Sequence, residues 1–358
     1  MARAPASPGT KALMGVPFEF LNAMLRGRRR LVYEGARLGE VAEVRSVEEL
    51  ARRLCPREAV GGRLGLERRL RADCLRELTF FLHYLSAQVE GFYLALVRRF
   101  QVDAIQTLLR LFAGGREEPA PERFLPDLPP ALALDVGALM ASGGLDEFCS
   151  GLPGGFAEAA LASLDLCERT DSAAFAEMAV ERAFWEAVTG SLAGLPARWR
   201  EACARPVLSE LRSTRLLTVL RATGVHGVEW EDVERILPAC DPRLHADEGA
   251  QPSESALRAL HADPSVQKAA VLVPGLRSRG RAEAAGEVGA SLVELEDMCW
   301  RATFRLANRL YYAVLEGPAT LVSYFYVRRN EMKELTALVE ALHYGRRPPW
   351  REGDGSGA

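Results

Sequence analysis

Apolar residues recur every three or four positions along most of the chain, which is the period of an α-helix with one buried face. The clearest run is a seam of about three heptads, typical of a long helix packed lengthwise against another helix. It consists of Leu75, Leu78, Leu82, Leu85, Val89, Phe92 and Leu96. Apolar and polar residues scarcely alternate over four or more positions, so strand signals are weak. The sequence therefore predicts an all-α protein with one long helix through residues 75–96.

Glycines and prolines mark where the other predicted helices stop. A short helix begins at Phe18, and Ser46 with Glu49 forms a predicted capping box. Residues 116–130 carry five prolines and read as a connector. The remaining long helices are expected from Asp171-Ser172 to the break at residues 194–196, onward to Gly224, from Leu292 to about Leu310, and from Pro318 to about Gly345.

A block of helices occurs three times along the chain. Each copy closes on a charged residue, a polar residue three positions on, and a Leu-rich run. The copies occupy residues 103–110, 212–221 and 331–338. Their starts lie 109 and 119 residues apart, a longer period than the roughly 20–50 residues of solenoid repeats. The copies open on Asp103, Arg212 and Glu331, so what they share is helix order rather than charge.

The repeated block predicts three small helical domains of one design around a shared centre. We expect a flexible tail over residues 1–15 and another over 347–358. The domains between them are expected at residues 16–118, 119–235 and 236–346.

Composition narrows the class of protein. The 358 residues are 48% hydrophobic and 26% charged, as in globular proteins, and the net charge of −3 does not suggest a nucleic-acid partner. No apolar stretch approaches the roughly 20 residues of a membrane helix, since residues 310–327 are interrupted by Glu316, Gly317 and Pro318. The N-terminus lacks the apolar core of a signal peptide. These features predict a cytoplasmic protein without direct membrane insertion, associated with membranes only through a partner.

The sequence contains few candidate motifs for catalysis, nucleotide binding or metal binding. The chain has no phosphate-binding GxxxxGK[ST] loop and no GxSxG elbow, and its seven cysteines form no CxxC pair. Residues 61–65 are glycine-rich but lack phosphate-loop spacing, and Cys240 with His245 is the nearest approach to a metal pair. The acidic residues around Trp230 suit a helix N-terminus. The sequence predicts no catalytic residues, no cofactor and no metal.

Two groups of side chains have open interpretations. Arg26, Arg28, Arg29 and Arg30 either stabilise a helix C-terminus or form a docking surface for acidic protein loops or anionic headgroups. An aromatic group near the C-terminus is expected mainly in the core, with some members available to an interface. It comprises Tyr311, Tyr312, Tyr324, Phe325 and Tyr326.

Four stretches carry a resemblance to a known family. Residues 18–26 are similar to its opening helix, and 103–110 to its Asp-x-x-Asn helix with Gln106 in place of Asn. Residues 132–161 are similar to its short-helix connector, and 315–345 to its C-terminal helix pair. The family that these stretches resemble is the C subunits of archaeal and bacterial V/A-type rotary ATPases, which are called d subunits in the vacuolar enzymes.

The chain also departs from the family pattern. Arg212, Arg215 and Trp185 stand where the family tends to acid or amide, and residues 238–290 match poorly.

The resemblance implies three similar helical domains in a pseudo-threefold funnel and a non-catalytic, mechanical function. The protein would sit on the membrane proteolipid ring, receive the foot of the central shaft of D and F subunits in its cavity, and turn with both. It would bind no nucleotide. The alternative is an unrelated all-helical interaction scaffold whose cavity or groove binds a different protein. A helical enzyme would require an acidic metal cluster that the sequence does not display.

Overall fold

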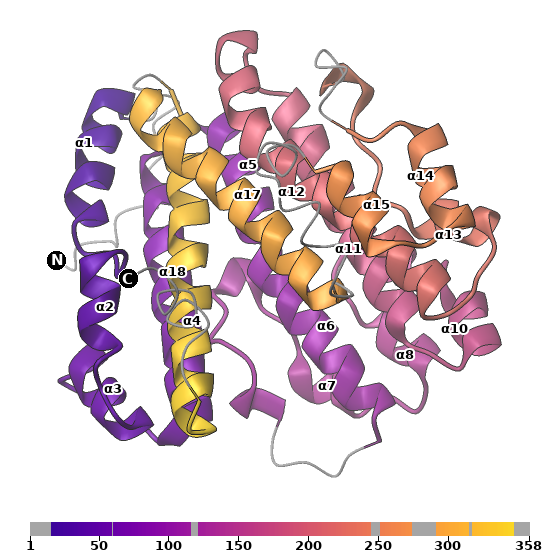
Figure 1. Cartoon of the computed structure of the whole chain (residues 1–358), viewed down its shortest axis with the longest axis horizontal. Coiled ribbons are helices and arrows are strands. Elements are labelled where there is room, and N and C mark those ends of the chain that lie inside the picture. Colours follow the sequence, from indigo (N-terminus) through magenta and orange to yellow (C-terminus); the bar gives the residue numbers. More distant parts are fainter. Residues whose placement is uncertain are drawn as a thin grey trace, which may run out of the picture.

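The computed structural model describes residues 16–58, 60–115, 121–244, 251–273, 291–314 and 317–346. Throughout these residues the ordered elements are helices, and none of them forms a strand. Figure 1 shows long helices in the middle of the molecule with shorter ones on both flanks. The all-α prediction is confirmed. The predicted tails and the Gly- and Arg-rich segment 274–290 lie outside the described residues.

The long helices lie at the centre, and the α-helices and 3-10 helices around them are short. The long ones are α4 (Gly62–Phe80), α6 (Arg99–Ala113), α11 (Ala174–Ala193), α12 (Ala197–Gly224), α17 (Leu292–Ala313) and α18 (Ala319–His343). The others are α1 (Phe18–Arg29), α2 (Ala36–Val41), α3 (Val47–Leu54), α5 (Ala87–Val97), α7 (Val136–Met140), α8 (Leu145–Ser150), α9 (Gly155–Leu161), α10 (Leu164–Thr170), α13 (Trp230–Ile236), α14 (Glu254–Ala262) and α15 (Val266–Val271). The 3-10 helices are η1 (Phe81–Tyr84), η2 (Pro121–Arg123), η3 (Pro130–Leu132) and η4 (Pro242–Leu244).

Three helical hairpins form the frame. The first pairs α4 and η1 with α5 and α6, the second pairs α11 with α12, and the third pairs α17 with α18. Their connections lie at residues 85–86, 195–196 and 317–318, which we call the turn end. The opposite ends of α6, α12 and α18, at Ala113, Gly224 and His343, we call the free end. In Figure 1 the turn of the third hairpin is at the top and the C-terminus of α18 at the bottom.

The prediction of one helix through residues 75–96 is wrong. Helix α4 ends at Phe80, a 3-10 turn follows, and Leu85 is extended before α5 begins at Ala87. Leu82 is half-buried in the turn, whereas the other six positions of the seam are buried. The heptad spacing thus predicts correctly which residues are buried, but it does not predict that they belong to one continuous helix. A compact turn can preserve the spacing of buried positions.

The third turn shows why its glycine is required. Gly317 has a φ of +74°, and a Cβ there would lie 2.5 Å from Cδ1 of Trp199. The Trp199 ring packs edge-on against Phe18 at a centroid distance of 5.0 Å. This contact joins α1, α12 and the turn before α18, so a side chain at position 317 would disrupt packing of three segments that are distant in sequence.

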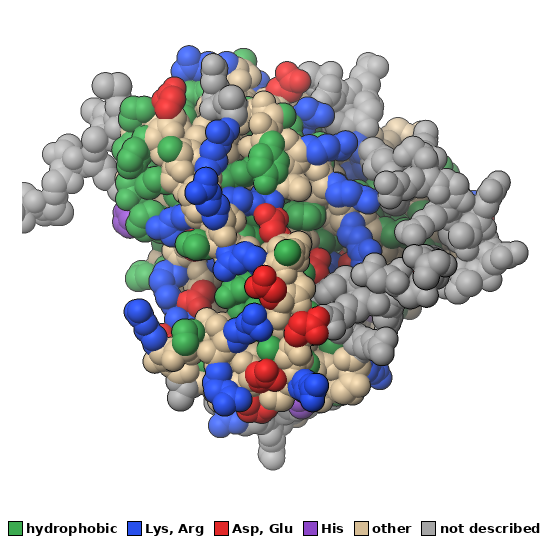
Figure 2. Space-filling view, turned by 60° about the vertical axis from the view of Figure 1, so that its left-hand side comes forward, with side chains coloured by type: hydrophobic (Ala, Val, Ile, Leu, Met, Phe, Trp, Pro, Cys, Tyr) green, Lys and Arg blue, Asp and Glu red, His purple; other side chains and the backbone are tan. Residues whose placement is uncertain are grey.

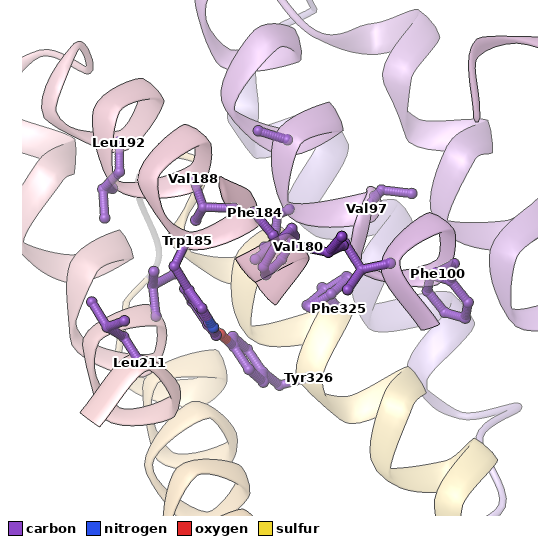
Figure 3. Packing of buried hydrophobic residues seen from close by; sticks show 14 of the residues in the cluster. Val97, Phe100, Val180, Phe184, Trp185, Val188, Leu192, Leu211, Phe325 and Tyr326 are labelled. Carbon is purple, nitrogen blue, oxygen red and sulfur yellow. The ribbon is translucent and has the colours of Figure 1, made fainter. Parts of the chain in front are cut away.

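The hairpins pack on one another in cyclic order. Helices α5 and α6 pack on α11, α12 packs on α17, and α18 packs on α4. Figure 3 shows the core between them, where Phe184 of α11 lies near residues of α6 and α18 and Trp185 points toward Tyr326. These large aromatic side chains are fully buried or nearly so. Each hairpin therefore contacts the next, and the third returns to the first.

Short helices cover the outside of the frame. Helices α1 and α3 pack on α18, and a separate small core joins α2, α3, α4 and the end of α18 through residues such as Leu50, Leu66 and Leu338. On the opposite side, α9, α10 and α13 pack on α11, while α14 packs on α12.

Two helix starts differ from the predicted ones. The Ser46 hydroxyl accepts from the backbone N–H of Glu49 at 3.1 Å, but the Glu49 carboxylate accepts from Arg45 rather than from Ser46, so only half of the capping box forms. Helix α11 begins at Ala174, because Asp171 adopts a left-handed conformation that ends α10. A complete capping box, which the sequence reasoning does not predict, opens α17 at Ser291 and Glu294.

Candidate functional site

A central cavity of about 1210 Å³ lies inside the ring of hairpins. Six of the described α-helices contribute to its wall, namely α4, α6, α11, α12, α17 and α18, together with residues 123–126 and 225–226. All three repeated segments of the sequence meet here. Their lining residues follow helical spacing, with Asp103, Gln106, Thr107 and Arg110 on α6, Ser213, Thr214, Leu217 and Arg221 on α12, and Met332, Lys333, Thr336 and Ala337 on α18.

The charged residues that open the three repeats are not equivalent in space. Asp103 lines the cavity, whereas Arg212 and Glu331 do not. Burial lowers the pKa of Arg212 to about 10. Glu331 is also buried, and it accepts a hydrogen bond of 2.6 Å from the backbone N–H of Tyr33 and pairs with Arg328. The helical segment is therefore repeated, but its first charged residue lies in a different environment in each copy.

A buried network lies on the α6 and α11 wall toward the turn end. Arg99 pairs with Glu181 and, through Nε, with Oδ1 of Asp103 at 2.9 Å. Glu181 also accepts from Nε1 of Trp185 at 2.8 Å and from Nε2 of Gln106 at 3.2 Å. Burial alone would lower the pKa of Arg99, but the two carboxylates outweigh it and raise that pKa above its usual range. The guanidinium therefore stays charged and depends on its partners.

A second pair, largely shielded from solvent, joins the second and third hairpins. Arg329 of α18 bonds Glu210 of α12 at 2.8 Å, and both side chains are about 13% exposed. The Arg329 guanidinium also lies 4.8 Å from the ring centroid of Trp300, whose Nε1 donates to Asn330 at 2.9 Å. Together with the Arg99 network, this pair ties the three hairpins to one another.

Charged pairs toward the free end are more exposed. Arg221 bonds Glu296 at 2.7 Å, with side chains 45% and 53% exposed. Arg110, which pairs with Glu177, is 66% exposed. Such pairs contribute little to stability because water screens them, so their side chains remain available to a molecule in the cavity.

The wall has few features suited to catalysis. In the part of the chain that the structure describes, no group of three or more His, Cys, Asp or Glu side chains is placed to hold a metal ion. Glu67 is the lining carboxylate with a raised pKa, caused first by burial and then by Glu340, against the opposing effect of Arg71 and Arg63. The remaining arrangement of paired charges and helix faces suits the binding of a protein segment.

The predicted basic cluster at residues 26–30 divides in two. Arg29 is buried, bonds both Glu34 and Asn308, and lies 4.8 Å from the ring centroid of Tyr311. Arg28 stacks over Phe80 at 4.3 Å. Arg26 and Arg30 are exposed. None of the four lines the cavity.

Most of the aromatic group is core, as expected. Tyr311, Tyr324, Phe325 and Tyr326 are buried, whereas Tyr312 is 63% exposed. Among the cysteines, all but the half-buried Cys240 are buried. The acidic residues at Trp230 do open a helix, α13. His245, which together with Cys240 is the nearest approach to a metal pair in the sequence, lies outside the described residues.

Sequence reasoning missed the part of the wall supplied by α11 and α17, including Glu177, Glu181 and Glu296. These residues belong to the first helix of each hairpin, and the repeat is recognisable only in the second. A usable signal is present, since Glu177 and Glu181 are four residues apart and share a helix face.

Comparison with known proteins gives the family. No curated protein matches the chain. The family model described as ATP synthase (C/AC39) subunit matches residues 21–348. None of the described helices is long and apolar enough to cross a membrane. The chain therefore belongs to the V/A-type ATP synthase C/AC39 subunit family, whose members are accessory rather than catalytic parts of a rotary ATPase complex.

Proposed function

We propose that this protein couples the central shaft of a V/A-type rotary ATPase to the membrane proteolipid ring. The foot of the shaft, made of the D and F subunits, would enter the central cavity. The observation that carries this proposal is the meeting of residues 103–110, 212–221 and 331–338 around one cavity. A socket built from corresponding helices of three hairpins suits a rod-like partner better than a small substrate.

The cyclic packing of the hairpins supports a three-domain reading with pseudo-threefold, funnel-like symmetry. In this proposal the domains are residues 16–118, 119–235 and 236–346, each contributing one hairpin. The most extensive contact between each pair of hairpins joins the second part of one to the first helix of the next, and α12 also contacts α18. A closed ring of this kind has no open seam, which is useful in a part that must transmit torque without separating.

Stiffness follows from the same construction. Helix α12 has 28 residues and α18 has 25, and the second half of each lines the cavity. The buried pairs Arg99–Glu181 and Arg329–Glu210 bridge neighbouring hairpins. Close packing along a helix resists bending, so the wall would transmit torque from the shaft rather than absorb it.

The exposed part of the basic cluster is the candidate for docking elsewhere in the complex. Figure 2 shows the flank that carries α1–α3, where Lys and Arg side chains stand among hydrophobic ones. Arg26 and Arg30 are exposed there, as are Leu31 and Phe20. We propose that Arg26 and Arg30 contact an acidic loop or anionic headgroup, while Arg28 and Arg29 hold α1 in place.

Purification in mild detergent tests the assignment. The protein should bring down both the shaft subunits and the proteolipid ring. Its isolation with unrelated proteins would contradict the coupling role and favour the alternative, a general helical scaffold. Calorimetry on the purified chain should detect no binding of ATP.

A cavity-filling variant tests the socket itself. Thr336 lies on the cavity wall and is half-buried, so Thr336→Trp should obstruct shaft entry. We expect loss of shaft binding and of ATP-driven ion transport, with the ring still bound. Arg305→Trp is the matched control, because Arg305 is exposed on α17 and absent from the cavity wall. Normal coupling in Thr336→Trp would exclude the cavity as the shaft site.

A further inference from the structure

The three walls of the cavity differ in charge. Among the described lining residues, α4 and α18 carry four cations and two carboxylates, namely Arg63, Arg71, Arg329 and Lys333 against Glu67 and Glu340. A fifth cation beside this wall, the exposed Arg123, belongs to η2, which packs on α4. Helices α6, α11, α12 and α17 carry three cations and five carboxylates, namely Arg99, Arg110 and Arg221 against Asp103, Glu177, Glu181, Glu210 and Glu296. A pseudo-threefold frame thus encloses a cavity whose charge is not threefold.

The imbalance persists among the charges that solvent reaches. On α4 and α18 the accessible side chains are those of Arg63, Arg71, Lys333 and Glu340, between 27% and 45% exposed. Glu67 lies between them but is only 7% exposed. On the helices of the remaining walls, the accessible cations Arg110 and Arg221 are equalled in number by the accessible carboxylates Asp103 and Glu296, although Arg110 itself pairs with the less exposed Glu177.

Arg71 of the basic wall is only loosely neutralised by the carboxylates of that wall. Arg63 and Arg71 lie 3.6 and 3.5 Å from Glu67, too far for short hydrogen bonds. Oε1 of Glu67 is buried without a hydrogen-bond partner. Lys333 reaches across to Asp297 of α17 at 3.1 Å, while Arg63 also pairs with Glu340. An incoming carboxylate would therefore find donors that are incompletely used.

We infer that the occupant of the cavity presents an acidic face to the α4–α18 wall and is thereby held in one of three otherwise similar orientations. This inference rests on the proposed function, and the occupant is a helical protein segment bearing carboxylates on one side. Complementary charge fixes orientation and excludes wrong ones, since like charges facing each other are costly. A cavity that transmits torque needs such an asymmetric contact, because a cavity with three equivalent walls would permit the occupant to slip between orientations.

Two double variants with the same change in charge test the inference. Arg71→Glu with Lys333→Glu reverses the basic wall, and Arg110→Glu with Arg221→Glu reverses one cation on each of two other walls. Binding of the purified shaft subcomplex is measured by calorimetry at low and high salt. The first variant should bind about tenfold or more weakly and lose salt dependence, while the second should stay within about threefold.

The outcomes separate the two proposals. If the unmodified protein does not bind the shaft, the proposed function fails. If it binds but both double variants weaken binding equally, or neither does, a single acidic face against α4 and α18 is refuted. Thermal unfolding establishes that the variants fold. The double variant Arg71→Met with Lys333→Met is a second test by shaft binding, because it removes the two cations without introducing a new charge.

A zero-length cross-link identifies the contact directly. The chain has only three lysines, at positions 11, 268 and 333. A carbodiimide joins a lysine to an adjacent carboxylate, so the complex should yield an amide between Lys333 and an acidic residue of the shaft. Lys333→Arg should preserve affinity and abolish this link. Cross-links confined to Asp297 within the chain would count against the inference.

Discussion

The two ends of the cavity use similar residues for different purposes. Toward the turn end, Arg99 and Glu181 are 15% and 11% exposed and are joined by Trp185 and Gln106 in one network. Toward the free end, Arg221 and Glu296 form an ion pair of comparable geometry that is about half exposed. Burial, rather than the presence of an ion pair, therefore distinguishes the charged side chains that hold the hairpins together from those that are available to a partner.

Removal of one carboxylate at each end is the strongest test of this difference. Glu181→Ala leaves Arg99 buried with only Asp103 as an ionic partner and should cost about 3–5 kcal/mol of unfolding free energy. Glu296→Ala at the free end should cost less than about 1 kcal/mol. Urea denaturation of both variants measures the two costs. Similar losses would mean that the turn-end network is no more structural than the free-end pairs.

Two glycines with positive φ extend the comparison to the backbone. Gly317 lies at the turn end with φ +74° and Trp199 close to its missing Cβ, while Gly345 lies at the free end with φ +63° and open space around it. Gly345→Ala should cost about 1 kcal/mol, the strain of a left-handed alanine. Gly317→Ala should cost about 2–3 kcal/mol, because Trp199 must also move.

Thermal unfolding in the two alanine variants separates these contributions. A larger shift for Gly317→Ala reports the packing of Trp199 against Phe18 and the turn. Equal shifts would show that the contact around Gly317 relaxes without cost, and the turn end would then be less tightly built than its geometry indicates.

The sequence predicts local features at both ends, but not the contacts between them. The turns at residues 195–196 and 317–318 are predictable because proline and glycine interrupt the helices there. The turn at 85–86 is not, since neither residue is glycine or proline and the heptad spacing continues across it. Glycine and proline thus predict a turn, but a turn can also form where both are absent.

The site is predictable only in outline. The repeat indicates that residues 103–110, 212–221 and 331–338 share a role, and all three segments reach one cavity. The identity of the lining carboxylates depends on contacts such as Arg99–Glu181, whose residues lie far apart in the chain. The division of the basic cluster depends in the same way on Asn308 and Tyr311, which bury Arg29 and leave Arg30 outside.

Glu67 provides the finest test, because it is a buried carboxylate located near the free end. Its raised pKa means that the folded protein binds a proton at Glu67 more tightly than the unfolded chain does. The stability from this tighter binding is fully present below the unfolded pKa and is lost as pH rises through the folded value. Glu67→Gln lacks that loss, so its stability relative to the unmodified protein should improve from about pH 4 to about pH 8, by under about 1 kcal/mol.

Glu296→Gln is the matched control for the pH series, since it changes an exposed carboxylate at the same end of the cavity. Its stability relative to the unmodified protein should change little over the same range. If Glu67→Gln behaved likewise, position along the cavity would determine the role of a charged residue. If only the stability of Glu67→Gln responds to pH, burial determines the role of a charged residue in the cavity. The exposed cations around Glu67 then remain available to the partner.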